Sequence, residues 1–155
     1  MGKVEIHLIT HLPPQIRVLE KEAVEEDFRF LTRLIAEWNS GANRFNAPGE
    51  CLMAAYRNKQ LIGIGGLSVD PYADKNMARL RRVYVSASSR RHHVGQTLVK
   101  ALVAHAAQRF QRVCLFTDTA VGDAFYLKCG FTRIEDVHAT HAMCLSNSLL
   151  DVSRA

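Results

Sequence analysis

The sequence contains no apolar run near the roughly 20 residues that a membrane-spanning helix requires. Residues 1–10, MGKVEIHLIT, alternate polar and apolar side chains and lack the long apolar stretch of a secretory signal peptide. A carboxyl-terminal lipidation motif is also missing. These absences predict a cytoplasmic protein that has no membrane partner.

The cysteines lack any clustered motif. Cys51, Cys114, Cys129 and Cys144 are far apart in the chain, with no CxxC pair among them. Each lies beside apolar residues, so we expect buried, reduced thiols. A catalytic cysteine is the alternative, but none has the neighbouring histidine or helix start that lowers a thiol pKa.

Two nucleotide-binding signatures are missing as well. The chain has no GxxxxGK[ST] motif, which argues against a mononucleotide P-loop, and no GxGxxG motif, which argues against a dinucleotide fold. It also has no internal repeat. Its 155 residues, 48% of them hydrophobic, predict one packed domain over 1–155, with a core over about 3–145. Folding should bury roughly 70% of the surface of the open chain.

Positive charge is in excess, and its position is informative. The chain has 20 Lys and Arg against 15 Asp and Glu, a net charge of +5. Segment 79–93, RLRRVYVSASSRRHH, holds five arginines and no acid, so the rest of the chain is balanced. One reading is a solvated charged loop; the other is a compact site for an anion.

Hydrophobic periodicity predicts the elements of the first part of the chain. Alternation over 4–10 predicts a strand, and Pro13-Pro14 can open a helix over 15–26. Asp27 is expected to cap a second helix, which Ser40-Gly41 ends. The apolar residues of that second helix form one stripe: Phe28, Leu31, Leu34, Ile35 and Trp38.

The remaining elements predict a mixed sheet. Segments 51–57 and 60–69 form a hairpin around Asn58-Lys59. A strand–helix–strand unit then implies parallel pairing. The full order is β-α-α-β-β-β-α-β-α-β-β, an α/β fold with a mixed central sheet of about seven strands. The later elements are strand 77–85, helix 95–110, strand 112–117, a helix over 120–129 that Gly130 ends, strands 131–135 and 138–145, and a loose tail over 146–155.

The strongest candidate site lies where strand 77–85 meets helix 95–110. A helix start exposes unpaired N–H groups and partial positive charge, which favour an anion. Gly95 lets a ligand approach the backbone, and Arg90 and Arg91 carry forked donors suited to phosphate. These features predict a phosphate site.

A second segment, AFYLKCGF at 124–131, follows the next strand. In open α/β sheets ligands bind at the carboxyl ends of the strands, so Tyr126 should lie near the anion site. We interpret Phe125 and Phe131 as core aromatics.

Taken together, RVYVSASSRRHHVGQTLVKAL at 82–102 and AFYLKCGF at 124–131 resemble the GCN5-related N-acetyltransferase (GNAT) superfamily. Arg90 to Gly95 occupies the family signature R/Q-x-x-G-x-G/A, with His93 in place of the middle glycine. Histidine tolerates positive φ better than most residues do. The resemblance covers about 3–145 and implies the acyl-CoA N-acyltransferase fold.

The resemblance implies acetyl-CoA as co-substrate, no metal, and direct transfer of acetyl to a primary amine of a small molecule or a protein. The backbone of Val83, Tyr84 and Val85 would hold the pantetheine arm and stabilise the oxyanion. Tyr126 would be the general acid, or would only position the sulfur. The residues of the pyrophosphate loop would be Arg90, Arg91, His92, His93, Val94, Gly95 and Gln96.

The general base stays open among Asp118, Asp70 and Glu37. His138 and His141 are three apart on a predicted strand and so face opposite sides, which argues against a metal pair. His141 is either near the acceptor or a structural histidine.

The acceptor stays open as well. By resemblance, its pocket is built from the first two helices, the hairpin loops and the last strands. Asp70, Asp74 and Glu37 could attract a cationic amine, whereas Arg79 and Arg81 could bind a carboxylate. A homodimer is expected by analogy with the family.

Two other function classes are compatible with these features. One is a catalytically silent acyl-CoA-binding or partner-docking module of the same fold. The other is a nucleic-acid binder that uses segment 79–93. The compact charge, without interleaved aromatics in the loop, disfavours a nucleic-acid partner.

Overall fold

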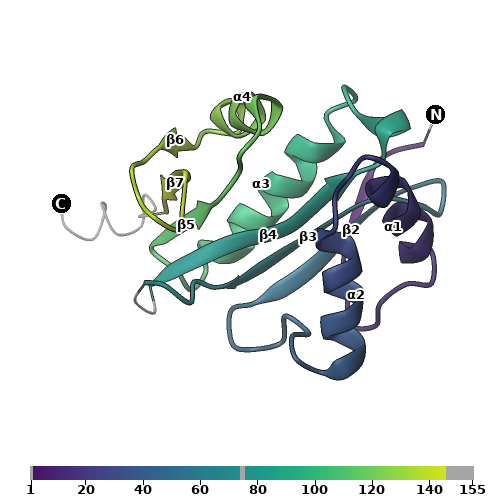
Figure 1. Cartoon of the computed structure of the whole chain (residues 1–155), viewed down its shortest axis with the longest axis horizontal. Helices are drawn as coiled ribbons and strands as arrows, with labels where there is room; N and C mark the ends of the chain where they lie inside the picture. Colours follow the sequence, from purple (N-terminus) through teal and green to yellow (C-terminus); the bar gives the residue numbers. More distant parts are fainter. Residues whose placement is uncertain (1, 74–75, 146–155) are drawn as a thin grey trace.

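A seven-stranded sheet in the order β1-β2-β3-β4-β5-β7-β6 forms the centre of the molecule (Figure 1). The computed structural model describes residues 2–73 and 76–145. All neighbouring strands are antiparallel except β4 and β5, so the predicted mixed sheet with one parallel pair is confirmed. The strands are β1 (Glu5–Leu8), β2 (Cys51–Arg57), β3 (Gln60–Val69), β4 (Met77–Val85), β5 (Arg112–Leu115), β6 (Thr132–Arg133) and β7 (His141–Cys144).

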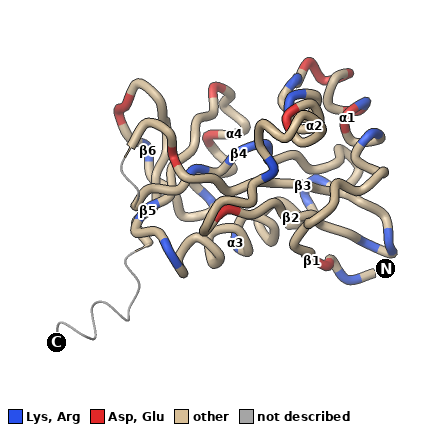
Figure 2. The backbone as a smooth tube through the Cα atoms, turned by 90° about the horizontal axis from the view of Figure 1, so that it is seen from below, with Lys and Arg blue, Asp and Glu red and all other residues tan. Residues whose placement is uncertain are grey.

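Helices cover both faces of the sheet. Figure 2 shows α1 (Ile16–Glu25) and α2 (Phe30–Ser40) on one side and α3 (Val94–Ala106) on the other. A short helix, α4 (Ala120–Lys128), follows β5. No helix in the described part of the chain is long and apolar enough to cross a membrane. The buried side chains of the helices recur every three to four residues, as expected for one buried face. They are Leu31, Leu34 and Ile35 on α2 and Leu98, Val99 and Leu102 on α3.

The hairpin of β2 and β3 has the predicted bounds and turn. Asn58 and Lys59 both adopt positive φ, of 51° and 66°, as a two-residue type I′ turn requires. Gly41 ends α2 in the left-handed conformation, and Gly130, at φ 99°, follows α4 in the same way.

Several predicted boundaries are wrong. Asp27 does not cap α2: it adopts φ 68°, and the helix starts at Phe30 without a side-chain cap. Phe28 therefore lies outside the helix and is 36% exposed. Helix α3 ends at Ala106 rather than 110, and β7 starts at His141 rather than 138. The predicted tail over 146–155 lies outside the described residues.

A β-bulge shapes β4 at its centre. Gly66 pairs with Arg81 and Ile64 pairs with Tyr84, so Arg82 and Val83 together oppose Gly65. Arg82 adopts φ 60° there. A bulge bends its strand and re-aims the side chains that follow. The strand continues to Val85, although its pairing with β5 is confined to Met77–Arg79. The carboxyl-terminal part of β4, after Arg79, therefore does not pair with β5.

Candidate functional site

The two parallel strands separate on the side where the predicted site lies. Ser86 donates its N–H to Ile62 at 2.8 Å, and hydrogen bonding alternates along an antiparallel pair. Val85 must therefore direct its own N–H and C=O away from β3, into the opening between β4 and β5. Its carbonyl accepts a hydrogen bond from Arg90 Nε at 3.0 Å.

The loop that follows presents a series of unpaired N–H groups. Within the described chain, the backbone N–H groups of residues 91–96 have no protein acceptor, and no side chain caps α3. Arg91 and His93 adopt φ of 68° and 62°, and such left-handed residues turn successive N–H groups into a concave anion site. The expectation that His93 tolerates positive φ at the glycine position is confirmed. The donor set fits a pyrophosphate.

Gly95 has a packing role that the sequence did not predict. A Cβ placed there would lie 3.0 Å from two ring carbons of Phe125. The missing side chain lets α4 pack on the first turn of α3. This contact brings the two motif segments together, as the sequence predicted, but it explains the glycine without a ligand.

Three of the five arginines in segment 79–93 are paired with acids. Arg79 bonds Asp70 at 2.8 Å, Arg82 bonds Glu37 at 3.1 Å and Arg90 bonds Glu26 at 2.7 Å. The acids lie 9, 45 and 64 residues from their arginines in sequence, so composition within one segment could not reveal them. Figure 2 accordingly shows basic segments spread along the chain.

Arg91 differs from Arg90 in the loop. It is exposed and has no acidic partner among the described residues. The guanidinium of Arg90, in contrast, is used by Glu26 and by the Val85 carbonyl. The sequence predicted that Arg90 and Arg91 would both offer a guanidinium to a phosphate. In the structure the Arg90 guanidinium is already used, whereas the Arg91 guanidinium is available.

Two acids at the carboxyl-terminal end of α1, Glu22 and its C-cap Glu26, hold this loop, a role that the sequence did not predict. The single proton of the Tyr84 hydroxyl is shared between the nearby carboxylates of Glu22 and Glu26, and Glu22 also accepts from Ala87 N–H at 2.6 Å. The ion pair with Arg90, followed by the Tyr84 hydrogen bond, lowers the pKa of Glu26 to about 2. Burial, together with the two carboxylates, raises the pKa of Tyr84 well above its usual value. The only sequence signal was the run of acids at the end of α1.

Tyr126 lies in an aromatic cluster between α4 and the sheet. Its ring makes edge contacts with Phe125 and Phe131, with centroids 4.9 and 5.7 Å away. Burial, more than the nearby Cys129, raises the pKa of the Tyr126 phenol. The hydroxyl stays protonated at neutral pH and is a donor. Phe131 is buried in the core, and Phe125 is partly buried against it, as predicted.

His141 is buried next to Tyr126, with ring centroids 6.3 Å apart. One ring nitrogen lies 2.8 Å from Asp123 and the other 2.8 Å from the Thr140 hydroxyl. These two contacts support a structural role for His141 rather than a role at the acceptor. His138 stacks on Tyr72 outside β7, so the prediction that both histidines share a strand is wrong.

The three predicted base candidates differ in surroundings. Asp70 is buried against Arg79, Glu37 pairs with Arg82, and Asp118 is exposed beyond the end of β5.

The four cysteines differ in how deeply they are buried. Burial raises the pKa of Cys51 to about 12 and that of Cys114 to about 11, which makes both thiols inert at neutral pH. Cys144 is exposed, contrary to the prediction that all four are buried. No group of three metal-ligating side chains occurs in residues 2–73 and 76–145.

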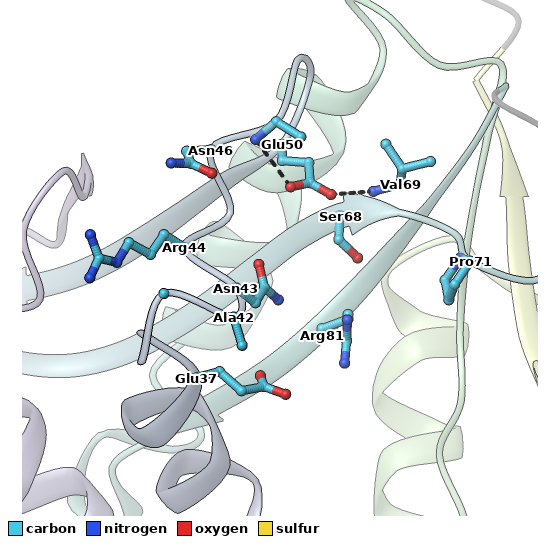
Figure 3. A pocket seen from close by; sticks show the side chains of 12 residues that line it. Glu37, Ala42, Asn43, Arg44, Asn46, Glu50, Ser68, Val69, Pro71 and Arg81 are labelled. Carbon is cyan, nitrogen blue, oxygen red and sulfur yellow. Dashed lines mark hydrogen bonds between the residues drawn. The ribbon is translucent and has the colours of Figure 1, made fainter. Parts of the chain in front are cut away.

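A pocket of about 440 Å³ opens between α2 and the strands β3 and β4 (Figure 3). This volume lies in the usual range for small-molecule sites. The end of β3 contributes Ser68 and Val69, β4 contributes Arg81, and the segment after α2 forms the opposite wall. The lining residues that carry polar side chains are Glu37, Asn43, Arg44, Asn46, Glu50, Ser68 and Arg81.

The comparisons with known proteins agree with this geometry. Residues 14–131 match the acetyltransferase (GNAT) family. Over 111 residues, covering 66% of this chain and 71% of the relative, the chain is 35% identical to aminoglycoside N(6')-acetyltransferase type 1 of Klebsiella aerogenes. The chain belongs to the GNAT acetyltransferase family.

Solved structures show the same fold. A protein of Exiguobacterium sp. 255-15 assigned as an acetyltransferase superposes with a TM-score of 0.85 at 23% identity, covering 98% of this chain and 99% of that one. A GNAT family N-acetyltransferase from Escherichia coli, crystallised with CoA, superposes with a TM-score of 0.68 at 14% identity, covering 97% and 86%.

Proposed function

We propose that the protein is an acetyl-CoA-dependent N-acetyltransferase that moves an acetyl group directly to a primary amine of a small molecule. The observation that carries this proposal is the series of unpaired N–H groups at 91–96, next to the part of β4 that has left β5. The N–H groups suit a pyrophosphate, and the unpaired edge of β4 suits an extended chain that carries amides.

Each part of the site has one task. The N–H groups of the loop and the Arg91 side chain hold the pyrophosphate. Val83 and Val85 hydrogen-bond the pantetheine amides with their backbone groups. An N–H near Val83–Tyr84 stabilises charge on the carbonyl oxygen, a contribution of about 3–4 kcal/mol per donor in other enzymes. Acetyl-CoA supplies the activated acyl group.

Tyr126 donates a hydrogen bond toward the departing sulfur. A thiol has a pKa of about 8.5 and a phenol one of about 10, and burial raises that of Tyr126 further. Full proton transfer from Tyr126 is therefore uphill. We therefore propose that Tyr126 stabilises and positions the thiolate by hydrogen bonding.

A small-molecule acceptor is supported by the Klebsiella aerogenes relative, whose name gives an aminoglycoside as its substrate. The pocket beside β4 has a volume in the usual range for small-molecule sites. Cytoplasmic location and assembly as a homodimer stay predictions.

The test has two stages. Acetyl-CoA should raise the melting temperature, and an amine panel should then give thiol release together with an acetylated product. Binding without turnover on any amine would instead favour the silent acyl-CoA-binding module. The absence of any shift at millimolar acetyl-CoA would contradict both.

A further inference from the structure

Three arginines of β4 lie beside two acids. Arg79 pairs with Asp70, and Arg82 pairs with Glu37. Arg81 lies near Glu37 as well, but no hydrogen bond or ion pair joins Arg81 to an acid in the described part of the chain. One positive charge in this cluster is thus left uncompensated.

Arg81 is also partly removed from water. It is half-buried, and this burial, with the neighbouring Arg82 and Arg79, lowers its pKa. A guanidinium stays charged even so, and a desolvated charge without a counter-ion is unfavourable. An anion placed against Arg81 would remove that cost.

Ser68 gives an independent observation at the same pocket. The residue is only 3% exposed, and its buried hydroxyl has no hydrogen-bond partner among the described residues. A buried polar group without a partner is uncommon in folded proteins. Ser68 lines the pocket with Arg81 (Figure 3), so a ligand can satisfy it there.

The pocket offers further donors but few unused acceptors. Asn43 uses its side-chain oxygen to accept from Phe45 N–H, which leaves its amide N–H₂ for a ligand. The two Glu50 oxygens already accept from Ala47 and Val69 N–H. Apart from one Glu37 oxygen that no hydrogen bond among the described residues uses, the groups that remain are donors, which bind a carboxylate.

Resting on the proposed function, we infer that the acceptor amine carries a carboxylate, which Arg81, Ser68 and Asn43 bind. Arg81 is two residues from Val83 on β4, with the bulge at Arg82 between them, so the carboxylate would be held a short distance from the reacting amine. The acceptor class is amino-acid-like, in contrast to a polycationic aminoglycoside.

Amine pairs that differ only in the carboxylate test this inference. Lysine is compared with cadaverine, phenylalanine with phenethylamine, and kanamycin serves as a carboxylate-free polyamine. We expect kcat/KM to be at least about tenfold higher for the carboxylate member of the accepted pair. Arg81→Gln and Ser68→Ala should reduce that preference by raising KM for the carboxylate member alone. Arg33→Gln, which removes an exposed charge from α2, should not change it.

Calorimetry of lysine and cadaverine with the CoA-loaded protein separates the two proposals. Lysine binding that Arg81→Gln abolishes, without turnover, would uphold the anion site and contradict the proposed function. Turnover of cadaverine or kanamycin as efficient as that of the acids would uphold the function and overturn the inference. Equal preference in wild type and Arg81→Gln would overturn it as well.

Discussion

Arg90 and Glu26 form a two-point ion pair, with distances of 2.7 and 2.8 Å, between helix α1 and the loop before α3. The same arginine reaches the Val85 carbonyl at the end of β4. One side chain thus joins the three segments that border the predicted CoA site.

Replacing Glu26 should loosen this loop. Glu26→Gln keeps an acceptor for Tyr84 but removes the charge that holds Arg90, so we expect acetyl-CoA affinity to fall by roughly three- to tenfold. Calorimetric titration measures the effect. Glu25→Gln, an exposed neighbour on the same helix, is the control. Equal affinities for the two variants would show that the ion pair does not position the loop.

The same pair predicts a pH dependence of stability. The folded-state pKa of Glu26 is lowered from 4.5 to about 2. A lowered carboxyl pKa stabilises the fold fully above 4.5, and the contribution is lost as pH falls toward 2. Urea unfolding should show wild type more stable than Glu26→Gln at neutral pH, with the difference shrinking below about pH 4. A constant difference would contradict this.

His93 tests the conformation of the loop. Because its φ is 62°, glycine can replace it without strain, whereas a β-branched residue cannot. His93→Gly should leave the free energy of unfolding within about 1 kcal/mol, and His93→Val should lower it by about 1–3 kcal/mol. His93→Val should also weaken acetyl-CoA binding. Equal behaviour of both variants would mean that positive φ is not required.

Substitutions at Gly95 and Phe125 should have coupled effects on stability. Alanine in a helix is usually more stabilising than glycine by about 1 kcal/mol, but here its Cβ meets the Phe125 ring at 3.0 Å. Gly95→Ala should lower stability in wild type and raise it in a Phe125→Leu background. A double-mutant cycle by urea unfolding measures the sign change. Additive effects would contradict the contact.

Tyr126→Phe should separate chemistry from binding. Loss of the hydroxyl should lower kcat by about 100-fold while the Kd for acetyl-CoA stays within about twofold. Tyr56→Phe on β2, outside the site, should change neither value. Unchanged turnover in Tyr126→Phe would remove this residue from the mechanism.

The sequence predicted what depends on local pattern and motif. The β2–β3 hairpin, the order of elements, and the meeting of loop 90–96 with α4 are all confirmed. It could not predict partners that only the fold brings together. The acids of Arg79, Arg82 and Arg90 are such partners, and they turn one apparent basic cluster into three ion pairs.

The full set of pocket residues could not be predicted from the sequence either. Arg81 was recognised as a possible carboxylate ligand, but an uncharged serine on a buried strand gives no such signal. Ser68 becomes informative only once its hydroxyl is seen to be buried without a partner among the described residues.

The central claim is that the N–H groups at 91–96 bind the pyrophosphate of acetyl-CoA. The most direct test is calorimetric titration with acetyl-CoA, with acetyl-phosphopantetheine, which keeps one phosphate, and with acetyl-pantetheine, which lacks the pyrophosphate and the 3′-phosphoadenosine. We predict one bound acetyl-CoA per chain, with acetyl-phosphopantetheine intermediate in affinity and acetyl-pantetheine at least about 100-fold weaker. Equal affinity for acetyl-phosphopantetheine and acetyl-pantetheine, or no binding of acetyl-CoA at millimolar concentration, would contradict the claim.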